Sequence, residues 1–404
     1  MSLLEQLSQK ETWKDFRIYK AERNQLSKRE LKELDVFIEE QKYLSVTDTF
    51  SFGYPTKKTI SKMGSEKKRT VYSYSDDETW VLKVLSWLLY RYDCKIPESC
   101  YSFRPHKTSK TAFDSIRKIP ELDCCFVLKA DIHDYFNSIN VDKLLIILHQ
   151  VIDDDEPLYQ FIEGLLTQDR CYYNDELITE KRGAMAGVPL ASFLANIYLM
   201  DMDLLFEQEN IPYYRYSDDI IIFCKDEKQL KHADTLLKEN LKEKDLELNM
   251  KKYHVSEPHQ SWEFLGFSYH EGQIDLSDGT IEKMKGKIRR KAHSIYRWKK
   301  RNNADYSRAA RSMIRSFDYK FYDLSGNNGF TWIRFYFPVI TVSDGLHKID
   351  QTMVQYLRYL KTGRHYKGNY EISYDYLKKL GYTSLVNEYY TWKKENEELK
   401  KSGL

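Results

Sequence analysis

The most restrictive feature of this sequence is a pair of adjacent carboxylates between two short apolar segments. Asp218 and Asp219 follow residues 213–216 (YYRY) and precede residues 220–224 (IIIFC). The aromatic and β-branched residues on both sides predict two short antiparallel strands joined by a tight turn. Neighbouring carboxylates repel each other, and such turns favour Gly or Asn, so fold stability alone does not explain this pair. The pattern therefore indicates that the negative charge of these two carboxylates has a functional role.

A third carboxylate lies near the end of another apolar segment. Residues 124–132 (CCFVLKADI) predict a buried strand that ends around Asp131. A strand-end carboxylate beside the turn would offer the hard oxygen ligands that Mg²⁺ prefers. Two such ions, about 3.5–4 Å apart, can activate an attacking hydroxyl and stabilise a leaving phosphate oxygen. These segments predict a two-metal site, with a solvated turn beside an unrelated strand end as the alternative.

The remaining pattern mixes helices with short strands. Ser75 and Glu78 form a capping box before an apolar helical stripe, and another helix is predicted to start near Thr108. Apolar spacing predicts further helices at 141–152, 157–166, 190–208 and 227–244. Residues 50–74 predict loops or a short hairpin, and 262–276 predict a second hairpin. This mixture is typical of the α+β class.

Charge is distributed unevenly along the chain. Residues 1–280 carry 37 Lys and Arg against 49 Asp and Glu, whereas residues 281–404 carry 26 against 12. The net charges of the two parts are therefore −12 and +14. Residues 283–301 contain ten basic residues and no acidic one. We expect a domain boundary near 276–282 and a basic C-terminal part that binds a polyanion, with coincidentally solvated faces as the alternative.

Other features place the chain among soluble, intracellular proteins. No segment approaches the ~18 apolar residues that a membrane helix requires. The N-terminus lacks the apolar core of a signal peptide. The six cysteines form neither a C-x-x-C pair nor a zinc-like cluster with histidine. We therefore expect a reduced, cytoplasmic protein that does not bind a membrane.

The order of several segments resembles that of the reverse transcriptases, within the bacterial lineage that includes group II intron, retron and phage-defence enzymes. The segments that carry the resemblance are, in chain order, 101–105 (YSFRP), 131–136 (DIHDYF), 187–199 (GVPLASFLANIYL), 216–219 (YSDD), 246–249 (LELN) followed by Lys252, and 264–267 (FLGF). The resemblance extends over about residues 60–270. Two positions depart from the family pattern: Ala186 replaces a Gln before Gly187, and Ala191-Ser192 replaces a Ser-Pro pair. These departures resemble the divergent bacterial groups tied to diversification or phage defence.

The resemblance implies a right-hand polymerase. Fingers are expected at 1–122, with 141–185 inserted between palm motifs, an α+β palm at 123–276, and a basic helical thumb at 277–404. The implied activity is RNA-directed DNA polymerase, a nucleotidyltransferase that makes cDNA from dNTPs on an RNA template. The expected cofactor is two Mg²⁺ ions, with Mn²⁺ as a substitute. The expected catalytic residues are Asp131, Asp218 and Asp219, and the expected metal ligands add the Ile132 carbonyl.

The resemblance and the chemistry of a triphosphate also imply binding residues. Lys62 and Arg69 are expected to contact phosphates, and Phe136 to lie under the sugar and exclude a 2′-hydroxyl. Lys252 is expected to neutralise or protonate the leaving pyrophosphate. Ala186 and Gly187 are expected to lie in the nucleotide pocket, which the Gln of relatives helps to shape, so the loss of that Gln bears on nucleotide discrimination, fidelity or template use. Arg104 is expected to contact nucleic acid, with bracing of the palm as an equal alternative. Further nucleic-acid contacts are expected in the basic C-terminal part, at Lys283, Lys287, Arg290, Lys291, Arg297 and Arg311. Arg308 and Arg315 are spaced to form a basic stripe with Arg311 on one helix face.

The biological context allows several interpretations. We expect a bacterial defence-associated reverse transcriptase that copies a cognate non-coding RNA supplied by its locus or host. A retron enzyme is the second choice, because no clear Val-Thr-Gly thumb motif is present. A template-independent or protein-primed polymerase of the abortive-infection type would share the same metal site. A non-catalytic RNA-binding scaffold is disfavoured by the three intact carboxylates.

Overall fold

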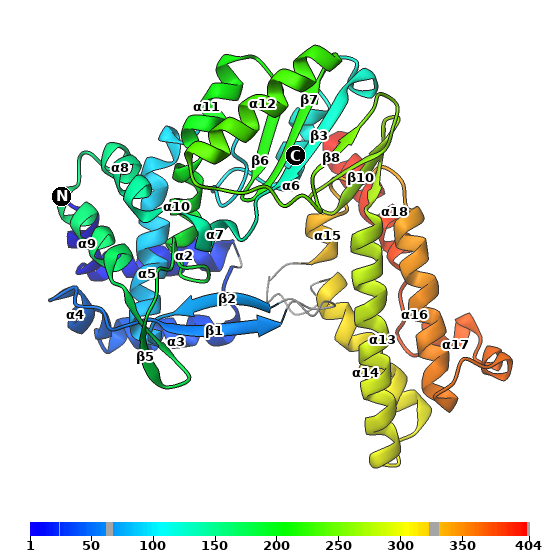
Figure 1. Cartoon of the computed structure of the whole chain (residues 1–404). Coiled ribbons are helices and arrows are strands. Elements are labelled where there is room, and N and C mark those ends of the chain that lie inside the picture. Colours follow the sequence, from blue (N-terminus) through cyan, green and yellow to red (C-terminus); the bar gives the residue numbers. More distant parts are fainter. Residues whose placement is uncertain (24, 62–67, 323–330, 402–404) are drawn as a thin grey trace. The chain divides into compact units, whose positions relative to one another are not determined.

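The protein is described here by a computed structural model that covers residues 1–23, 25–61, 68–322 and 331–401 (Figure 1). The chain divides into two compact units, Met1–Gln260 and Ser261–Leu404, which we call the first and second units. Helices and antiparallel strands occur in both units, which confirms the predicted α+β class. Within the described residues, no helix has the length and apolar character needed to cross a membrane.

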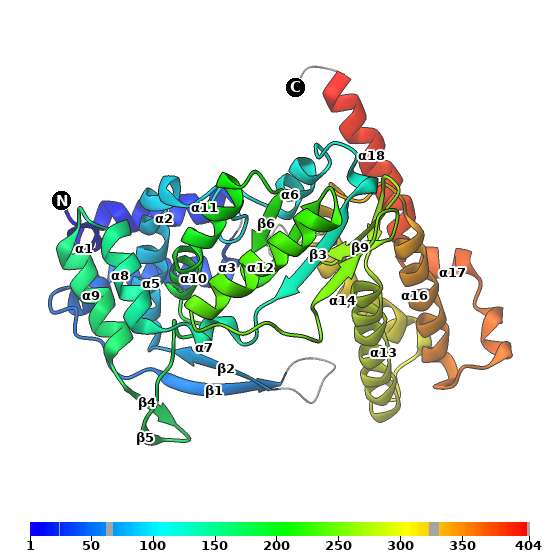
Figure 2. The same ribbon diagram turned by 45° about the horizontal axis from the view of Figure 1, so that its top comes forward.

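A four-stranded antiparallel sheet carries the carboxylates of the first unit. Its strands, in spatial order, are β6 (Tyr213–Tyr216), β7 (Asp219–Cys224), β3 (Phe126–Asp131) and β8 (His254–Ser256). The residues of β7 that follow Asp219 are all buried, because α12 (Glu227–Glu243) packs on β3 and β7. Figure 2 shows α12 lying along this sheet. The predicted strand at 124–132 and the predicted hairpin at 213–224 are confirmed.

A second sheet joins distant parts of the first unit. Its strands, in spatial order, are β2 (Lys68–Ser73), β1 (Thr56–Ser61), β4 (Arg170–Tyr173) and β5 (Glu176–Thr179). The β1–β2 hairpin is the one expected in residues 50–74. The second hairpin, β4–β5, attaches to it through a parallel pair between Thr56 and Tyr172. This attachment was not predicted, because nothing in either local sequence specifies its partner.

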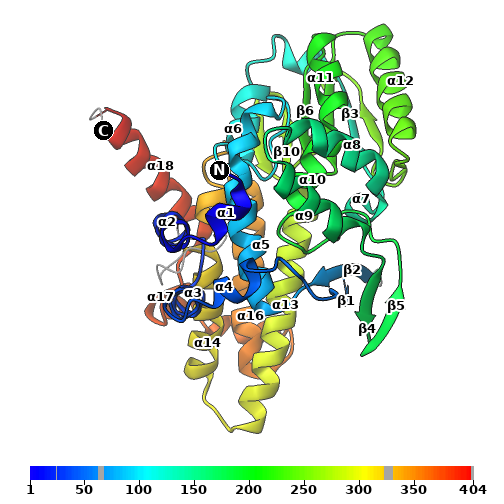
Figure 3. The same cartoon turned by 90° about the vertical axis from the view of Figure 1, so that its left-hand side faces the viewer.

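The first unit also has a layer of helices that includes α5, whose apolar side is buried. The layer consists of α1 (Leu3–Leu7), α2 (Lys10–Glu22), α3 (Lys28–Glu39), α4 (Lys42–Thr47), α5 (Asp76–Leu88), α8 (Val141–Val151) and α9 (Glu156–Thr167). Ser75 and Glu78 form the predicted capping box at the start of α5, and Val81, Leu82 and Leu85 are fully buried. Figure 3 shows α1 to α5 gathered on one side of the first unit.

The remaining elements of the first unit connect these layers. They are η1 (Leu89–Lys95), α6 (Ser109–Ile116), η2 (Leu122–Cys124), α7 (Tyr135–Ser138), α10 (Ala191–Tyr198) and α11 (Met200–Gln208). The prediction of one helix over 190–208 is wrong in detail. Leu199 has φ −105° and ψ 11°, so the segment breaks into α10 and α11. Thr108 caps α6 as predicted.

The second unit combines a small sheet with long helices. Its elements are β9 (Trp262–Phe264), β10 (Phe267–His270), β11 (Gln273–Leu276), α13 (Asp278–Arg301), α14 (Tyr306–Phe321), α15 (Trp332–Phe335), α16 (Asp344–Thr362), η3 (Lys367–Glu371), α17 (Tyr374–Lys379) and α18 (Leu385–Lys401). The unit begins at Ser261, earlier than the boundary predicted near 276–282. The reason is that the small sheet packs on its own helices. The Thr341 amide donates to the Ile274 carbonyl at 2.8 Å, and the Thr280 hydroxyl donates to the Gly266 carbonyl at 2.9 Å.

Candidate active site

Strand pairing brings the three predicted carboxylates to one edge of the β6–β7–β3–β8 sheet. In the register of β3 and β7, Asp131 lies directly opposite Asp219. The Ile132 amide donates to the Asp218 carbonyl at 3.2 Å, which holds the end of β3 against the β6–β7 turn. Asp131 is almost fully buried, whereas Asp218 and Asp219 are half-buried. Two segments far apart in sequence therefore present their carboxylates together, as predicted.

The turn itself is tighter than the predicted Asp-Asp tip. Tyr216 pairs with Asp219, so Ser217 and Asp218 form the two-residue loop and Asp219 begins β7. Ser217 has φ +61°, a conformation that two-residue hairpins require and that a non-glycine residue rarely adopts. The backbone here is held in place by the surrounding structure rather than by the preference of serine.

Two residues that sequence reasoning missed hold this turn. The Ser217 amide donates to the Ser102 hydroxyl at 2.9 Å. That hydroxyl donates to Asn196 Oδ1 at 2.8 Å, and Asn196 Nδ2 donates back to the Ser102 carbonyl at 2.7 Å. Both side chains are buried. Their only sequence signal was their place in the 101–105 and 187–199 segments, because the contacts themselves are long-range.

The site has an excess of negative charge. Burial, followed by repulsion from Asp219 and Asp131, raises the pKa of Asp218 to about 6. Asp131 accepts a hydrogen bond from Asn249 Nδ2 at 2.9 Å and forms an ion pair with the Lys252 ammonium. Burial opposes the charge on Lys252, but its hydrogen bond to Asp131 and the attraction of all three carboxylates raise its pKa overall. Lys252 thus offsets part of the negative charge.

The donor set fits a divalent cation. Carboxylate oxygens are the hard ligands that Mg²⁺ and Mn²⁺ take, and a bound cation would lower the pKa of Asp218, which burial and the two neighbouring carboxylates raise. Among the described residues, no three His, Cys, Asp or Glu side chains are already arranged to hold an ion. In this structure the Lys252 ammonium occupies one side of Asp131 instead.

Two of the predicted nucleotide contacts lie beside each other. The Arg69 guanidinium of β2 lies 5.9 Å from the centre of the Phe136 ring of α7. The Phe103 ring continues this line, 6.4 Å from Phe136 and 6.3 Å from Tyr216 next to the turn. Side chains of the first unit therefore form a line of contacts from the Arg69 guanidinium, through the Phe136 and Phe103 rings, to Tyr216 next to the turn. Lys62 lies outside the described residues.

The Ala186-Gly187 segment is attached to β2 through its backbone. The Tyr72 amide donates to the Ala186 carbonyl at 2.8 Å, and the Ala186 side chain is buried. Gly187 has φ +100°, and a Cβ added there would lie 2.9 Å from the Tyr72 carbonyl oxygen. Only glycine satisfies both the conformation and the close approach.

Arg104 requires a correction. Its side chain is buried, and its donors are directed to the Asp93 carboxylate and to the backbone carbonyls of Asp93, Pro97 and Cys100 at 2.7–3.2 Å. All five N–H groups of a guanidinium can be accounted for by these bonds. The structure supports the bracing alternative, and no donor is left for a template phosphate.

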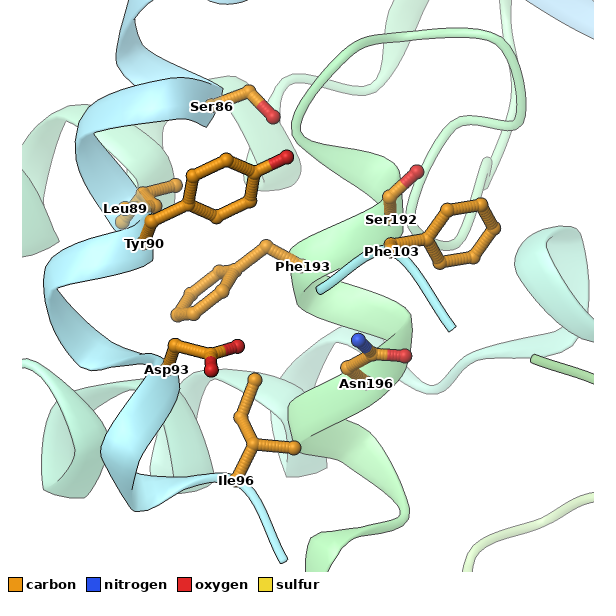
Figure 4. Close-up of a pocket in the computed structure, with 9 residues that line it drawn as sticks. All are labelled: Ser86, Leu89, Tyr90, Asp93, Ile96, Phe103, Ser192, Phe193 and Asn196. Atoms are coloured by element: carbon orange, nitrogen blue, oxygen red, sulfur yellow. The ribbon is translucent and has the colours of Figure 1, made fainter. Parts of the chain in front are cut away.

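A small pocket adjoins the site in the first unit. It has a volume of about 140 Å³ and lies between α10 and the junction of α5 with η1 (Figure 4). Tyr90 and Asp93 line one wall, and Asn196 lines the other. Phe103 also lines the pocket, so the aromatic line and the Ser102–Asn196 support meet there. Sequence reasoning did not identify this pocket.

The predicted nucleic-acid contacts of the second unit lie on exposed helix surfaces. Lys283, Arg290, Lys291 and Arg297 are exposed and Lys287 is half-buried on α13, while Arg311 is exposed on α14. Within the described residues, none of the six forms an ion pair. Burial, then repulsion from Lys287 and Lys291, lowers the pKa of Lys320, which shows that these three ammonium groups lie close together. Like charges gathered in this way favour binding of a polyanion.

Comparisons with known proteins identify a family for this chain. Residues 56–269 match the family model described as reverse transcriptase (RNA-dependent DNA polymerase). The retron Ec86 reverse transcriptase of Escherichia coli is 26% identical over 270 residues, which cover 65% of this chain and 76% of that protein. Among solved structures, telomerase from Candida albicans in complex with a TWJ fragment of telomeric RNA matches with 14% identity and a TM-score of 0.46, over 81% of this chain and 62% of that one. Apo telomerase from Candida tropicalis matches with 14% identity and a TM-score of 0.43, over 77% and 64% respectively. This chain thus covers less than two thirds of either telomerase chain.

Proposed function

This chain belongs to the reverse transcriptase family, the RNA-dependent DNA polymerases, and we propose that Asp131, Asp218 and Asp219 carry out its nucleotidyl transfer. The observation that carries the proposal is the β3–β7 register, which sets Asp131 opposite Asp219 with Asp218 in the adjoining turn. A cluster of three carboxylates, one of them with a pKa of about 6, is costly for a fold. It is explained by a bound cation.

The carboxylates and one carbonyl would hold the metal. Asp131 and Asp218 would be shared ligands, the Ile132 carbonyl a further ligand, and Asp219 would complete the acidic pocket. Two divalent ions, Mg²⁺ with Mn²⁺ as a substitute, supply activation of the primer 3′-hydroxyl and neutralisation of charge on the transferred phosphate. Because Lys252 pairs with Asp131 in this structure, it must release or share that carboxylate when a cation binds.

Other residues of the first unit would position the nucleotide. Arg69 would contact the triphosphate, because its guanidinium lies near the Phe136 ring and is exposed. Phe136 would close the space beneath the 2′-carbon and so favour deoxynucleotides. Lys252 has a raised pKa and is protonated at neutral pH, so it carries a proton that the leaving pyrophosphate can accept.

The exposed basic residues of α13 would hold the template–product duplex. Phosphate contacts position a duplex without reading its sequence, and an RNA–DNA hybrid is held largely by shape and backbone. The proposed contacts are Lys283, Lys287, Arg290, Lys291 and Arg297, which form no ion pair within the described part of the chain.

We further propose that the template is a cognate non-coding RNA and that the enzyme acts in bacterial anti-phage defence, in the cytoplasm. The retron relative strengthens the retron alternative, although no Val-Thr-Gly thumb motif is evident in this sequence. Both interpretations predict a partner RNA. They differ in the identity of that RNA rather than in the chemistry of the site.

The test is to sequence the product. The purified full-length protein is incubated with a primed RNA of mixed sequence, all four dNTPs and Mg²⁺. A product complementary to the RNA supports templated synthesis, and the Asp218→Asn variant is the control for contaminating polymerase. A product unrelated to the added RNA would favour the template-independent alternative. No product with either Mg²⁺ or Mn²⁺ would contradict the proposed function.

A further inference from the structure

We propose that a groove along α14 binds a single-stranded segment of RNA, separately from the duplex assigned to α13. The groove has a volume of about 900 Å³. We define the α14 groove by the residues that line it and carry the argument: Trp298, Arg308, Arg311, Arg315, Ser316 and Tyr319. The inference rests on the proposed function, because it specifies how the RNA partner is held.

The first argument is uncompensated positive charge. Arg308, Arg311 and Arg315 are all exposed on one face of α14, and none forms an ion pair within the described residues. Like charges three or four residues apart on a helix repel each other. The sole carboxylate in the groove lining, Asp305, accepts the Arg308 backbone amide at 2.8 Å as the helix cap. The face therefore offers three guanidinium groups without a carboxylate partner among the described residues to an external anion.

Other helices of this chain show what an ordinary solvated face looks like. At the same spacing, Arg29 pairs with Glu33 at 2.8 Å, and Lys238 pairs with Asp234 at 2.6 Å. The α14 face has no such alternation of sign. Three guanidinium groups in a row instead suit phosphates, because each presents a planar fork of donors that matches phosphate oxygens.

The spacing fits a strand rather than a single phosphate. Arg308 and Arg315 are seven residues apart, which is about 10 Å along a helix. A strand in double-helical geometry carries a phosphate roughly every 3.4 Å along the axis, so the stripe can face up to about three phosphates of one strand.

Aromatic side chains at the two ends of the groove indicate an unpaired strand. The Arg308 guanidinium lies 5.5 Å from the centre of the Trp298 ring. At the other end, Tyr319 is 60% exposed, and no aromatic or hydrogen-bonding partner for it exists in the part of the chain that the structure describes. Trp298 is half-buried, but an exposed ring such as that of Tyr319 beside a basic groove is a stacking platform for bases. Bases inside a duplex already stack on each other and cannot use it.

The hydroxyl groups of the groove favour RNA over DNA. The Ser316 hydroxyl donates to the Ser312 carbonyl at 2.8 Å and so presents its lone pairs as acceptors. The 2′-hydroxyl of RNA can donate to such an acceptor, and DNA lacks this group. The arginines, the aromatic rings and the hydroxyl groups are therefore all consistent with one ligand, single-stranded RNA.

The experiment compares two triple variants of the full-length protein on three labelled probes. The probes are an unstructured RNA of about 20 nucleotides, the DNA of the same sequence, and a blunt RNA–DNA hybrid of the same length. The groove variant is Arg308→Gln, Arg311→Gln and Arg315→Gln. The matched control removes the same charge from α13 by Lys287→Gln, Arg290→Gln and Lys291→Gln. Thermal melting checks that both variants fold.

We expect the groove variant to lose at least about tenfold in affinity for the RNA, a loss at least about fivefold larger than its loss on the hybrid. Its log–log salt slope on RNA should become shallower by about 2, which corresponds to three contacts on a single strand. The control variant should show the opposite preference. Wild-type protein should bind the RNA more tightly than the DNA.

A second pair of variants tests stacking. Tyr319→Ala should weaken binding of the RNA, whereas Tyr319→Phe, which keeps the ring, should not. An abasic strand should not distinguish the two variants. Unchanged RNA binding by the folded groove variant, or equal losses on RNA and hybrid, would overturn the inference, and equal binding of the DNA would overturn the assignment to RNA. Extension of a primed RNA by the wild-type protein is scored separately, so failure of the proposed polymerase and failure of the groove are distinguishable.

Discussion

Helices α12 and α13 are both rich in charged residues, but only α12 balances them. The sequence of α12 contains four basic and four acidic residues, and Lys238 and Lys231 pair with the acidic residues four positions earlier. Residues 283–301, which make up most of α13, contain ten basic residues and no acidic one. Charge density is thus a poor indicator of function. The more informative property is whether a charged side chain has an oppositely charged partner in the folded structure.

The same contrast separates two acidic sites in the first unit. Asp203 is fully buried, but Arg215 donates to it from Nε at 2.7 Å and pairs with it through a second nitrogen, and the Tyr213 hydroxyl donates at 2.9 Å. Asp218 lies near two further carboxylates, which help raise its pKa to about 6. Asp203 therefore has its charge compensated within the fold, whereas Asp218 is the residue proposed to bind a ligand.

The largest effect is expected at the uncompensated carboxylates. Asp218→Ala combined with Asp219→Ala should abolish dNTP incorporation, because the proposed metal ligands are lost. The fold should remain intact, because removing these half-buried carboxylates also removes repulsion. Primer extension and thermal melting measure the two properties. Incorporation by a normally folded double variant would contradict the assignment of the metal site.

The opposite result is expected at the compensated pair. Asp203→Ala should lower the free energy of unfolding by about 3–5 kcal/mol, because it leaves the fully buried Arg215 without its counter-charge. Chemical denaturation measures this loss. Asp218→Ala serves as the control and should cost far less. Equal losses from both substitutions would remove the distinction between the two sites.

A smaller effect is expected from the exposed helices. Replacing Lys287, Arg290 and Lys291 of α13 by Ala should weaken binding to duplexes of unrelated sequence to a similar degree. The slope of log affinity against log salt concentration should become shallower by up to the equivalent of about three phosphate contacts, at about 0.9 per contact on B-form duplex. The matched control replaces the exposed Lys228, Lys231 and Lys242 of α12 and should change neither quantity.

An unchanged salt slope in the α13 variant would show that these charges only face solvent. Equal weakening by the α12 control would show that binding follows net charge rather than location. A loss confined to one duplex sequence would indicate recognition of a specific partner RNA.

The smallest effect is the pH dependence of stability. The folded pKa of Asp218, about 6, lies above the ordinary value of 3.8, so the folded protein binds this proton more tightly. Asp218 therefore destabilises the fold at neutral pH, and this penalty is relieved as pH falls from about 7 towards 4. Asp218→Asn should stabilise the metal-free protein at pH 7 by on the order of 1–2 kcal/mol, and the difference should vanish near pH 4. Melting in a chelator-containing buffer measures it, and a difference that does not depend on pH would contradict the shift.

Local sequence was sufficient for the elements that neighbouring residues determine. The hairpin at 213–224, the strand that ends at Asp131, the capping box at Ser75 and the helix start near Thr108 were all predicted, because periodicity and capping depend on residues a few positions apart. The order of the carboxylate-bearing segments was also enough to indicate the family. Apolar periodicity continued through Leu199, so the break between α10 and α11 was not visible in the pattern.

Only the tertiary structure decided which distant groups meet. The pairing of β1 with β4, the support of Ser217 by Ser102, and the ion pair of Lys252 with Asp131 join residues far apart in the chain. It also decided the role of identical residue types: Arg104 is buried with its donors satisfied, whereas Arg311 is exposed without an ion pair among the described residues. The physical reason is that burial and hydrogen-bond satisfaction depend on the packed surroundings of a side chain. These surroundings, more than the residue type, determine whether a charge stabilises the fold or is left to bind a ligand.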